Sequence, residues 1–565
     1  MKILLAAINA KYIHSNPAVY SLKAYAEEFK EGISIAEFTI NHQLDYILQE
    51  LYKEKPQVLC FSCYIWNINY VTEIINELHK LCPDTKIWVG GPEVSYQTEG
   101  FMERNPGVFG TMVLEGEETF LELCRYYHGE IDDLSRIKGI LYTDQDGTVK
   151  RTPKREPLSM DQIPFYYNSL TAFENRVIYY ESSRGCPFSC SYCLSSIDKS
   201  LRFRDIELVK KELDFFIGHK VGQVKFVDRT FNCNHAHAME IWKFIKEHDN
   251  GITNFHFEVS ADLLTEEEID FLAGMRRGLI QFEIGVQSIN PVTIKEIHRT
   301  MNLDVLYHSV RRIQKSKNIH QHLDLIAGLP FEDFKSFVRS FDEIYNLKPE
   351  QLQLGFLKVL KGSHIWEHAK EYGMLYHENP PYEILATKWI SYEEILKIKM
   401  VEEMLEIYYN SGQFEMTVRL LELAFESSFD MFYQLASYYE QNGLSQIQHS
   451  RMKRGEILRA FALDTDRAHK DIYEETLVYD LYARERLKKR PEWAKDLKPY
   501  KEITRKYCGN GKNVHLEPFT YQFIDSEKRT FDKYPRKKGE QLYLFSYGQK
   551  DKVGKNAQMV RLEEN

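Results

Sequence analysis

The 565-residue sequence contains no long apolar run. No stretch reaches the roughly 18 apolar residues that a membrane-spanning helix requires. The opening segment, MKILLAAINAKYIHS, has a short apolar run interrupted by Asn9 and Lys11, and no small-residue cleavage site follows it, so it does not resemble a secretory signal. We therefore expect a cytoplasmic protein that makes no use of a membrane and keeps its cysteines reduced.

The glycine motifs of common nucleotide sites are also missing. The loop after the first apolar stretch reads NAKYIHSNPA, without the G-x-G-x-x-G of a dinucleotide site or the G-K-[ST] of a phosphate loop. The net charge of −10 argues against nonspecific nucleic-acid binding. Residues 488–512 are nevertheless basic, which fits either a solvated helix face or a patch for an acidic partner.

Apolar strands and amphipathic helices alternate twice along the chain, which is too long for a single core. Residues 1–137 predict an α/β domain with a doubly wound, Rossmann-like parallel sheet. Residues 138–176 predict a hairpin that turns at Asp146-Gly147, followed by a proline-containing linker. Residues 177–375 hold six further βα units, which indicate a partial (β/α)6 barrel with functional residues at the carboxyl ends of its strands.

The character of the sequence changes after the barrel. Long helical patterns over residues 376–490 predict a mostly α-helical domain, which we expect to cover the barrel mouth and to determine selectivity. The last segment, residues 491–565, is polar and predicts an irregular C-terminal extension.

Three of the nine cysteines lie in the short segment RGCPFSCSYC. Cys186, Cys190 and Cys193 have the spacing C-x3-C-x2-C and follow a predicted strand. A structural zinc site normally has four ligands, whereas clustered thiolates also suit an iron–sulfur cluster. Three thiolates would leave one iron of a [4Fe–4S] cluster open to bind and reduce a substrate.

A zinc site completed by a distant ligand is the alternative interpretation. Cys233, His235 and His237 are candidates for that ligand. The six βα units around the cysteines favour the iron–sulfur interpretation. Cys60 and Cys63 also form a C-x2-C, but they lie in a predicted strand and are expected to be buried as small apolar side chains.

The cysteine spacing, with Tyr192 before the last cysteine, resembles the radical S-adenosylmethionine (SAM) superfamily. The resemblance covers about residues 177–375. It implies that the three cysteines hold a [4Fe–4S] cluster whose open iron binds SAM, and that reductive cleavage releases a 5′-deoxyadenosyl radical. It also implies SAM contacts at Phe188, Tyr192, Asp228, Glu258, Glu283, Gln287 and Gly328.

The N-terminal sheet resembles the cobalamin-binding domain of cobalamin-dependent radical SAM enzymes. Ser62 would lie near the dimethylbenzimidazole tail, Gly90 and Gly91 would let the backbone approach the corrin, and Glu115 and Gly116 would close its rim. The complete set of cobalamin contacts that this resemblance implies is Tyr12, His14, Ser62, Tyr64, Trp66, Gly90, Gly91, Glu115 and Gly116.

The sequence does not decide which residue, if any, contacts the lower face of the cobalt. The loop around His14 lacks the Asp and Gly of the Asp-x-His-x-x-Gly motif that supplies an axial histidine in other cobalamin domains. His14 is therefore either an axial ligand or a loop histidine bonded to backbone or to a corrin amide. Tyr64 or Trp66 is an alternative neighbour for an unligated cobalt.

The resemblance implies an enzyme that methylates an unactivated carbon, with cobalamin as methyl carrier and a second SAM as methyl source. The same cofactors also serve a non-methylating oxidation, cyclisation or rearrangement in relatives such as an anaerobic cyclase of magnesium-porphyrin biosynthesis. A cofactor-binding sensor and an RNA-modifying enzyme are less favoured. The expected partners are a small-molecule or peptide substrate and an electron donor such as flavodoxin or ferredoxin.

Overall fold

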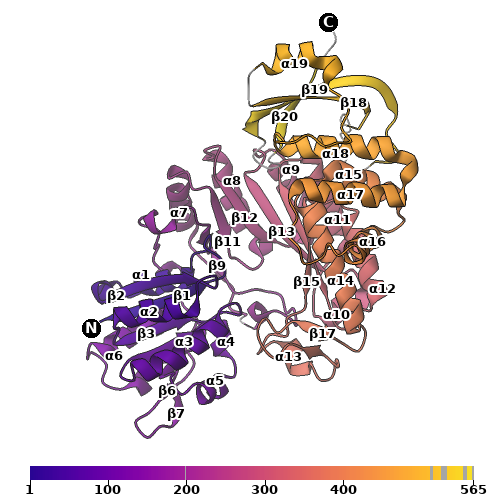
Figure 1. Cartoon of the computed structure of the whole chain (residues 1–565). Helices are drawn as coiled ribbons and strands as arrows, with labels where there is room; N and C mark the ends of the chain where they lie inside the picture. Colours follow the sequence, from indigo (N-terminus) through magenta and orange to yellow (C-terminus); the bar gives the residue numbers. More distant parts are fainter. Residues whose placement is uncertain (198, 510–512, 524–530, 551–555, 563–565) are drawn as a thin grey trace. The chain divides into compact units, whose positions relative to one another are not determined.

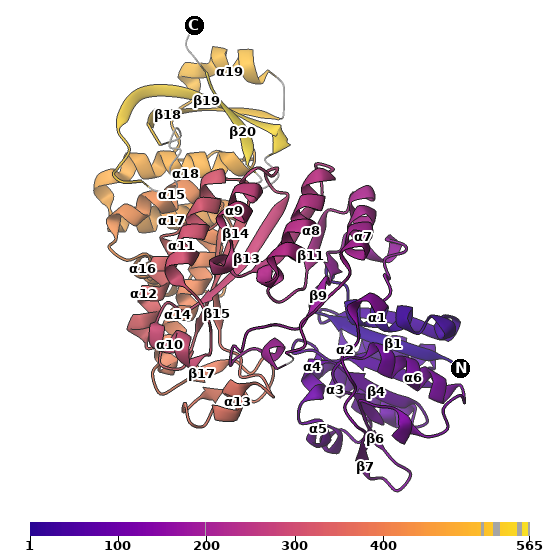
Figure 2. The same ribbon diagram turned by 180° about the vertical axis from the view of Figure 1, so that it is seen from behind.

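The structure is a computed structural model that describes residues 1–565 except 198, 510–512, 524–530, 551–555 and 563–565 (Figures 1 and 2). The chain divides into two compact units, which are described separately. The first unit comprises Met1–Glu283, Pro291–Ser309 and Phe356–Lys388. The second unit comprises Ile284–Asn290, Val310–Gly355 and Trp389–Asn565.

The first unit begins with a seven-stranded sheet in the order β2-β1-β3-β4-β5-β6-β7. The first five strands are parallel, as predicted, and the expected hairpin adds two antiparallel strands at the edge, so the sheet continues past residue 137. The strands are β1 (Ile3–Asn9), β2 (Ile33–Thr39), β3 (Val58–Ser62), β4 (Lys86–Gly90), β5 (Gly110–Met112), β6 (Ile140–Thr143) and β7 (Val149–Arg151).

Helices cover both faces of this sheet, because successive strand residues point to opposite faces. In β1, Leu4 packs with α2 (Leu44–Glu54) and α3 (Ile68–Leu81), whereas Leu5 packs with α1 (Pro17–Tyr25) and α6 (Glu117–Tyr127). Cys60 and Cys63 are buried in the two opposite cores, which confirms their expected role as small apolar side chains. Two short helices, α4 (Pro92–Ser95) and α5 (Thr98–Arg104), follow β4.

A second sheet has six strands in the order β15-β14-β13-β12-β11-β8, which confirms the six predicted strands. The register given for β8, β11 and β12 is parallel. Helices separate the strands in sequence, among them α7 (Ile206–Gly218), α8 (His235–Glu247), α9 (Glu266–Ala273), α11 (Leu303–Ser316) and α12 (Phe334–Tyr345). The strands are β8 (Ile178–Tyr180), β11 (Gln223–Phe226), β12 (Asn254–Val259), β13 (Ile280–Gln287), β14 (His320–Ala327) and β15 (Gln351–Phe356).

A small antiparallel ribbon of β9 (Ser183–Arg184) and β10 (Arg202–Phe203) follows β8. The segment between its two strands, residues 185–201, contains Cys186, Cys190 and Cys193 and is called the cluster loop below. Gly185 has φ +95°, and a Cβ there would lie 2.7 Å from the Ser200 carbonyl oxygen. Only glycine therefore fits at the start of the loop.

The second unit continues after the barrel strands with a bundle of helices. These are α14 (Tyr392–Met404), α15 (Glu415–Leu421), α16 (Ser428–Gln441), α17 (Arg451–Thr465) and α18 (Lys470–Arg484), in which α14 packs on α16, and α15 and α17 pack on α18. This bundle agrees with the predicted helical region.

The prediction of an irregular extension is wrong for the residues that the structure describes between 501 and 562. After α19 (Lys501–Cys508), three strands form an antiparallel sheet: β18 (Val514–Tyr521), β19 (Lys537–Lys550) and β20 (Ala557–Leu562). Phe519, Tyr543 and Phe545 of this sheet share a core with Val478 and Tyr482 of α18 (Figure 1). The helix supplies the other half of this core.

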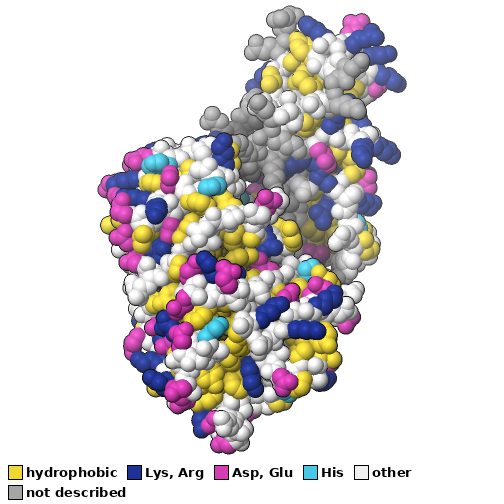
Figure 3. Space-filling view, turned by 90° about the vertical axis from the view of Figure 1, so that its left-hand side faces the viewer, with side chains coloured by type: hydrophobic (Ala, Val, Ile, Leu, Met, Phe, Trp, Pro, Cys, Tyr) yellow, Lys and Arg dark blue, Asp and Glu magenta, His cyan; other side chains and the backbone are white. Residues whose placement is uncertain are grey.

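No helix within the described ranges is long and apolar enough to cross a bilayer. The face shown in Figure 3 intersperses acidic, basic and apolar side chains.

Candidate functional site

A cavity of about 760 Å³ opens at the carboxyl ends of β1, β3, β4 and β5 in the first unit. Ligands of open α/β sheets bind at this edge. Its lining includes eight of the nine predicted cobalamin contacts: His14, Ser62, Tyr64, Trp66, Gly90, Gly91, Glu115 and Gly116. Tyr12 lies outside this lining, with 64% of its surface exposed and the Arg176 guanidinium 5.4 Å from its ring centroid.

Asn16 connects the loops that follow β1 and β3. Its side-chain oxygen accepts a hydrogen bond from the Val19 N–H and caps α1, while its Nδ2 donates to Ser62 Oγ at 2.9 Å. Ser62 is therefore held at the cavity wall by the helix cap. Pro17 begins the helix, as its fixed φ favours.

His14 forms a hydrogen bond with a residue of the barrel. Its Nδ1 lies 2.5 Å from the hydroxyl of Tyr179 on β8. Burial lowers the pKa of His14, and the positive charges of Lys11 and Lys225 lower it further, so the imidazole is neutral near pH 7. The ring partner is thus a tyrosine, where the Asp-x-His-x-x-Gly motif would place an aspartate.

Tyr64 and Trp66 form an aromatic part of the cavity wall. Their rings stack with centroids 4.4 Å apart and an interplanar angle of 6°. The Trp66 Nε1 donates to the Ile8 carbonyl oxygen at 3.0 Å, which fixes the indole. Both side chains are therefore held just beyond the carboxyl end of β3, where they form an apolar part of the cavity wall.

The two glycines after β4 have different reasons to be glycine. Gly91 has φ +116°, and a Cβ there would lie 2.4 Å from the Cys63 carbonyl oxygen. A Cβ at Gly90 would meet Met112 at 3.5 Å, an ordinary contact. Gly91 is thus required by the fold itself, whereas Gly90 is a small residue in the cavity wall.

Sequence reasoning missed the part of the cavity that the linker supplies. The lining includes Met160, Ile163, Phe165, Tyr166 and Tyr167. The clustered aromatic residues in MDQIPFYY were the available signal, because a solvated linker has no use for them.

The cavity lining fits a large ligand that carries amide groups. The Ser15 hydroxyl lines the cavity, is buried and has no hydrogen-bond partner among the described residues. Buried polar groups are normally paired, so a polar ligand group is expected at this position. The amide side chains at the corrin periphery provide such groups, and the stacked aromatic wall provides a surface for its apolar face.

The cluster loop holds its three cysteines close to the protein interior. Cys186 and Cys190 are each 8% exposed. Burial raises the pKa of the Cys186 thiol, and the neighbouring Cys193 and Cys190 raise it further. Three thiolates in this place therefore need bound cations, and iron supplies them.

Hydrogen bonds within the loop fix its shape. Ser196 Oγ donates to the carbonyl oxygens of Cys190 and Cys193, at 2.9 and 2.6 Å, and Lys199 Nζ donates to that of Phe188 at 2.5 Å. Across the described part of the chain, no three His, Cys, Asp or Glu side chains converge at the spacing of a single metal ion.

Arg299 contacts the cluster loop and was not anticipated from the sequence. Its Nη1 lies 3.9 Å from Cys190 Sγ and 3.3 Å from the Tyr192 hydroxyl. The guanidinium thus offsets negative charge at Cys190, and hydrogen bonds to the sulfurs are one determinant of a cluster's reduction potential. No local motif marks Arg299, because it is over one hundred residues from the cysteines.

Asp228 follows β11 and is bonded to residues just before the cluster loop. It accepts hydrogen bonds from the Ser182 N–H, the Ser182 hydroxyl at 2.7 Å and the Ser183 hydroxyl at 2.5 Å. Burial raises the pKa of Asp228 to about 6, despite these hydrogen bonds. Its visible role is to hold the ribbon against the end of β11.

Glu283 belongs to a polar layer inside the first unit's part of the barrel. Lys225 Nζ donates to its Oε2 at 3.0 Å, and His256 Nε2 lies 3.1 Å from the same oxygen. Burial opposes ionisation of Glu283, but hydrogen bonding by His256 and the charge of Lys225 hold its pKa at about 2. Lys225 pairs in register with Tyr179 and His256, so these groups share one level of the sheet.

The other predicted SAM contacts lie at strand ends or in the cluster loop. Glu258 is near the carboxyl end of β12, and Phe188 and Tyr192 belong to the cluster loop. In the second unit, Gln287 ends β13 with φ +71°, and its side-chain oxygen is buried without a hydrogen-bond partner in the described ranges. Gly328 follows β14 with φ +88°. The unpaired amide oxygen of Gln287 fits a polar ligand such as SAM.

Asp228 gives a prediction for pH. Its folded pKa of about 6 is above the ordinary value of 3.8, so the cost of burying its charge is absent below 3.8 and complete above 6. Between pH 5 and pH 8 this cost grows by about 1.4 kcal/mol, the equivalent of one pKa unit. The difference in the free energy of unfolding between the Asp228→Asn variant and the native protein should therefore shift by about that much in favour of the variant from pH 5 to pH 8. Denaturant midpoints of the cluster-free proteins at both pH values measure it, and an unchanged difference would contradict the raised pKa.

Comparison with known families agrees with this geometry. Residues 3–124 match the B12 binding domain, residues 180–344 match the radical SAM superfamily, and residues 370–538 match a protein domain of unknown function, DUF4080. The DUF4080 match extends from the last part of the first unit through the helical bundle and α19 to the start of β19.

Curated relatives are 21% to 26% identical to the chain over segments that cover about half of each protein. The cobalamin-dependent radical SAM methyltransferase TokK of Streptomyces tokunonensis is 26% identical over 341 residues, which cover 56% of this chain and 49% of TokK. The anaerobic magnesium-protoporphyrin IX monomethyl ester cyclase of Rubrivivax gelatinosus is 21% identical over 54% of this chain and 57% of the cyclase. The chain spans about half the length of the first of these relatives.

Solved structures share the fold. The cobalamin-dependent SAM radical enzyme OxsB has a TM-score of 0.60 at 16% identity, over 85% of this chain and 80% of OxsB. The radical SAM methyltransferase TsrM of Kitasatospora setae has a TM-score of 0.55 at 18% identity, over 68% of this chain and 80% of TsrM. The cofactors of this chain are a [4Fe–4S] cluster, SAM and cobalamin, as its two cofactor domains indicate. The chain is therefore a radical SAM protein with an N-terminal B12-binding domain.

Proposed function

We propose that this chain is a cobalamin-dependent radical SAM methyltransferase acting on an unactivated carbon. One observation carries the proposal: a single cavity is lined both by the predicted cobalamin loops and by residues that flank the cluster loop. Glu181, Ser183 and Arg184 in this lining flank the cluster loop, and Gly185, Leu194 and Ser195 belong to it. A methyl group is transferred only to a substrate radical formed within reach of it, so the two cofactors need a shared space.

The chemistry is divided between the cofactors and the chain. When bound, the cluster would supply the electron for reductive cleavage of SAM to methionine and a 5′-deoxyadenosyl radical, and cobalamin would supply the methyl group. The chain holds the cluster with Cys186, Cys190 and Cys193. The Tyr64–Trp66 pair excludes water from the cavity, and neutral His14 keeps the loop after β1 bonded to β8.

The remaining predicted contacts are part of the proposal. SAM would meet Phe188, Tyr192, Glu258, Gln287 and Gly328, with Asp228 and Glu283 in supporting positions. An external one-electron donor such as flavodoxin or ferredoxin would reduce the cluster, and the substrate would be a small molecule or a peptide.

Methyltransferases among the similar proteins favour methyl transfer as the reaction of this chain, but they do not identify its substrate. TokK and the bacteriochlorophyllide d C-12(1)-methyltransferase of Chlorobaculum tepidum, 26% identical over 280 residues, are methyltransferases. The magnesium-protoporphyrin cyclases show that a similar chain also serves another reaction. A non-methylating oxidation or cyclisation is therefore the second candidate function.

The test uses the full-length protein, reconstituted without oxygen with iron, sulfide and hydroxocobalamin and supplied with a reductant. It is incubated with methyl-deuterated SAM and a small-molecule extract of cells that lack the protein. Methyl transfer predicts a deuterated product and, in equal amounts, 5′-deoxyadenosine and S-adenosylhomocysteine, because one SAM is cleaved and a second donates the methyl group.

Two other results would redirect the assignment. 5′-Deoxyadenosine that accumulates while no product gains deuterium contradicts methyl transfer and supports the non-methylating alternative. Absence of 5′-deoxyadenosine from a protein that contains both the cluster and cobalamin would contradict radical SAM activity altogether.

A further inference from the structure

Two arginines face each other at the base of the cluster loop. Arg184 and Arg202 are register partners in the β9–β10 ribbon, which closes the loop that carries all three cluster cysteines. Like charges directly opposite each other in an antiparallel pair are destabilising. Their side chains are only 20% and 16% exposed, so water screens little of this repulsion. A carboxylate that contacts both side chains would offset the repulsion.

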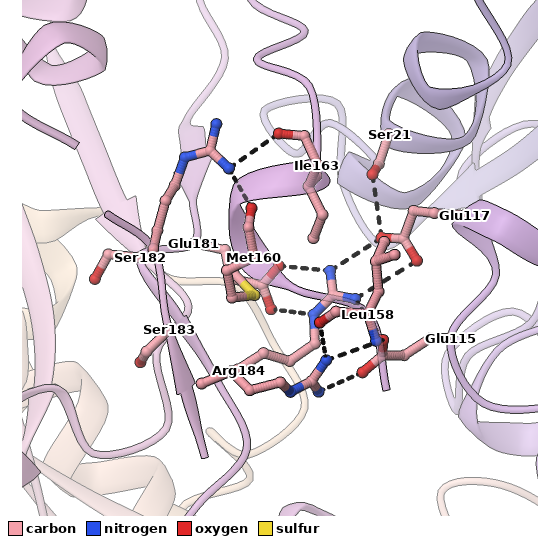
Figure 4. Close-up of polar contacts among 12 residues, drawn as sticks. Ser21, Glu115, Glu117, Leu158, Met160, Ile163, Glu181, Ser182, Ser183 and Arg184 are labelled. Atoms are coloured by element: carbon pink, nitrogen blue, oxygen red, sulfur yellow. Dashed lines mark hydrogen bonds and ion pairs between the residues drawn. The ribbon is translucent and has the colours of Figure 1, made fainter. Parts of the chain in front are cut away.

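That carboxylate comes from the other cofactor domain. Glu115 lies in the loop between β5 and α6, which is part of the cavity lining. Its Oε2 lies 3.2 Å from Arg202 Nη1 and 3.5 Å from Arg184 Nη1, and its Oε1 accepts from Arg202 Nη2 (Figure 4). Glu115 therefore touches both arginines.

The neighbouring contacts show how each arginine is otherwise held. Arg184 also binds Glu117 at 3.0 Å and, through Nε and Nη2, Glu181 at 2.9 and 2.8 Å (Figure 4). Arg202 also donates to the Leu158 carbonyl oxygen, and the Leu158 N–H donates to Glu115 at 3.0 Å. Glu117 and Glu181 thus contact Arg184, whereas Glu115 contacts both arginines.

We propose that Glu115 is a positioning residue for the iron–sulfur cluster. Its charge neutralises the Arg184–Arg202 pair, holds the β9–β10 ribbon closed and so keeps Cys186, two residues beyond Arg184, in place. The role does not depend on methyl transfer, since it concerns only how firmly the cluster is retained. It also ties the cluster loop to a residue of the cobalamin cavity.

The variant Glu115→Gln removes the charge and keeps both the side-chain shape and an oxygen that can accept from the Leu158 N–H. The readout is the rate at which the reconstituted protein loses iron to a ferrous chelator, without SAM or turnover. We expect the rate to rise at least about tenfold, a size typical of charges coupled in one network. Glu99→Gln is the matched control, because Glu99 pairs with Arg151 at the surface with half of its side chain exposed.

A second substitution separates charge neutralisation from a general packing defect. Arg202→Gln removes the repulsion, so the double variant E115Q/R202Q should lose iron within about threefold of the native rate. Rescue is not expected if Glu115 merely fills space. If E115Q is insoluble, the double variant should still be soluble and retain its cluster.

Three results would overturn the proposal. One is native-like iron loss from E115Q, whether or not its cobalamin affinity falls; with weaker cobalamin binding, Glu115 would be a cobalamin contact only. Another is a double variant that loses iron as fast as E115Q. The third is insolubility of both E115Q and the double variant. None of these results depends on finding the substrate, so they can be told apart from a failure of the proposed methyl transfer.

Discussion

Replacing Cys190 with alanine is expected to abolish both the iron–sulfur cluster and the formation of 5′-deoxyadenosine. The reason is that only three cysteines are available in the cluster loop, and two thiolates cannot hold a cube with one open iron. The loss also leaves the guanidinium of Arg299 facing a methyl group, where it now lies 3.9 Å from Cys190 Sγ. Absorption and electron paramagnetic resonance of the reconstituted protein measure the cluster, and chromatography measures the nucleoside.

Cobalamin binding should survive this change, because none of the three cluster cysteines lines the cavity. Cys82→Ala is the control: Cys82 is a partly exposed cysteine at the end of α3, outside the cluster loop, and its replacement should leave both cofactors bound. A Cys190→Ala protein that still contained a complete cluster would show that another residue completes the ligand set, and Cys233 would be the first to test.

Replacing Gly91 with alanine is expected to disrupt the cobalamin domain. The new Cβ would lie 2.4 Å from the Cys63 carbonyl oxygen, and φ +116° is disfavoured for any residue with a Cβ. With ψ 175°, this backbone conformation is essentially restricted to glycine and costs other residues about 1 to 3 kcal/mol, and the clash with backbone adds to it. We expect a lower free energy of unfolding by roughly 3 kcal/mol or more, and loss of cobalamin from the protein after gel filtration.

Two control variants separate the cost of the backbone conformation from the cost of the steric clash. Gly147→Ala, in the exposed hairpin turn, has φ +80° and no neighbour within 4 Å, so it should show the conformational cost without the clash. Gly90→Ala meets Met112 at 3.5 Å and should fold normally. A Gly91→Ala protein as stable as Gly147→Ala would contradict the predicted clash.

Much of the architecture was predictable because its signals are local. β1 is apolar on both faces, as a central parallel strand covered by helices must be, and Pro17 marks the start of α1. The cysteine triad was also readable, because all three ligands fall within eight residues. The same is true of the loops after β3, β4 and β5, whose positions follow from the strands before them.

The contacts that depend on distant segments were not predictable. Arg299 approaches Cys190 across more than one hundred residues, and Glu115 reaches the ribbon across about seventy. The linker aromatics line the cavity together with loops that precede them by fifty or more residues in the sequence. The C-terminal sheet was missed although β19 contains the apolar stretch QLYLFSY, because its core is completed by α18, a helix that ends well before β18 in the sequence.

Glu115 also bears on how freely the two cofactor domains can be recombined. Domains that recur separately in many proteins are often treated as interchangeable modules. Here two arginines face each other in the β9–β10 ribbon of the barrel, at the base of the cluster loop. The carboxylate that contacts both of them belongs to the preceding domain. A barrel excised at residue 177, or fused to a foreign cobalamin domain without a carboxylate at this position, would lose the carboxylate that contacts both arginines. Chimeras of this protein should therefore be designed with the β5–α6 loop and the β9–β10 ribbon transferred together.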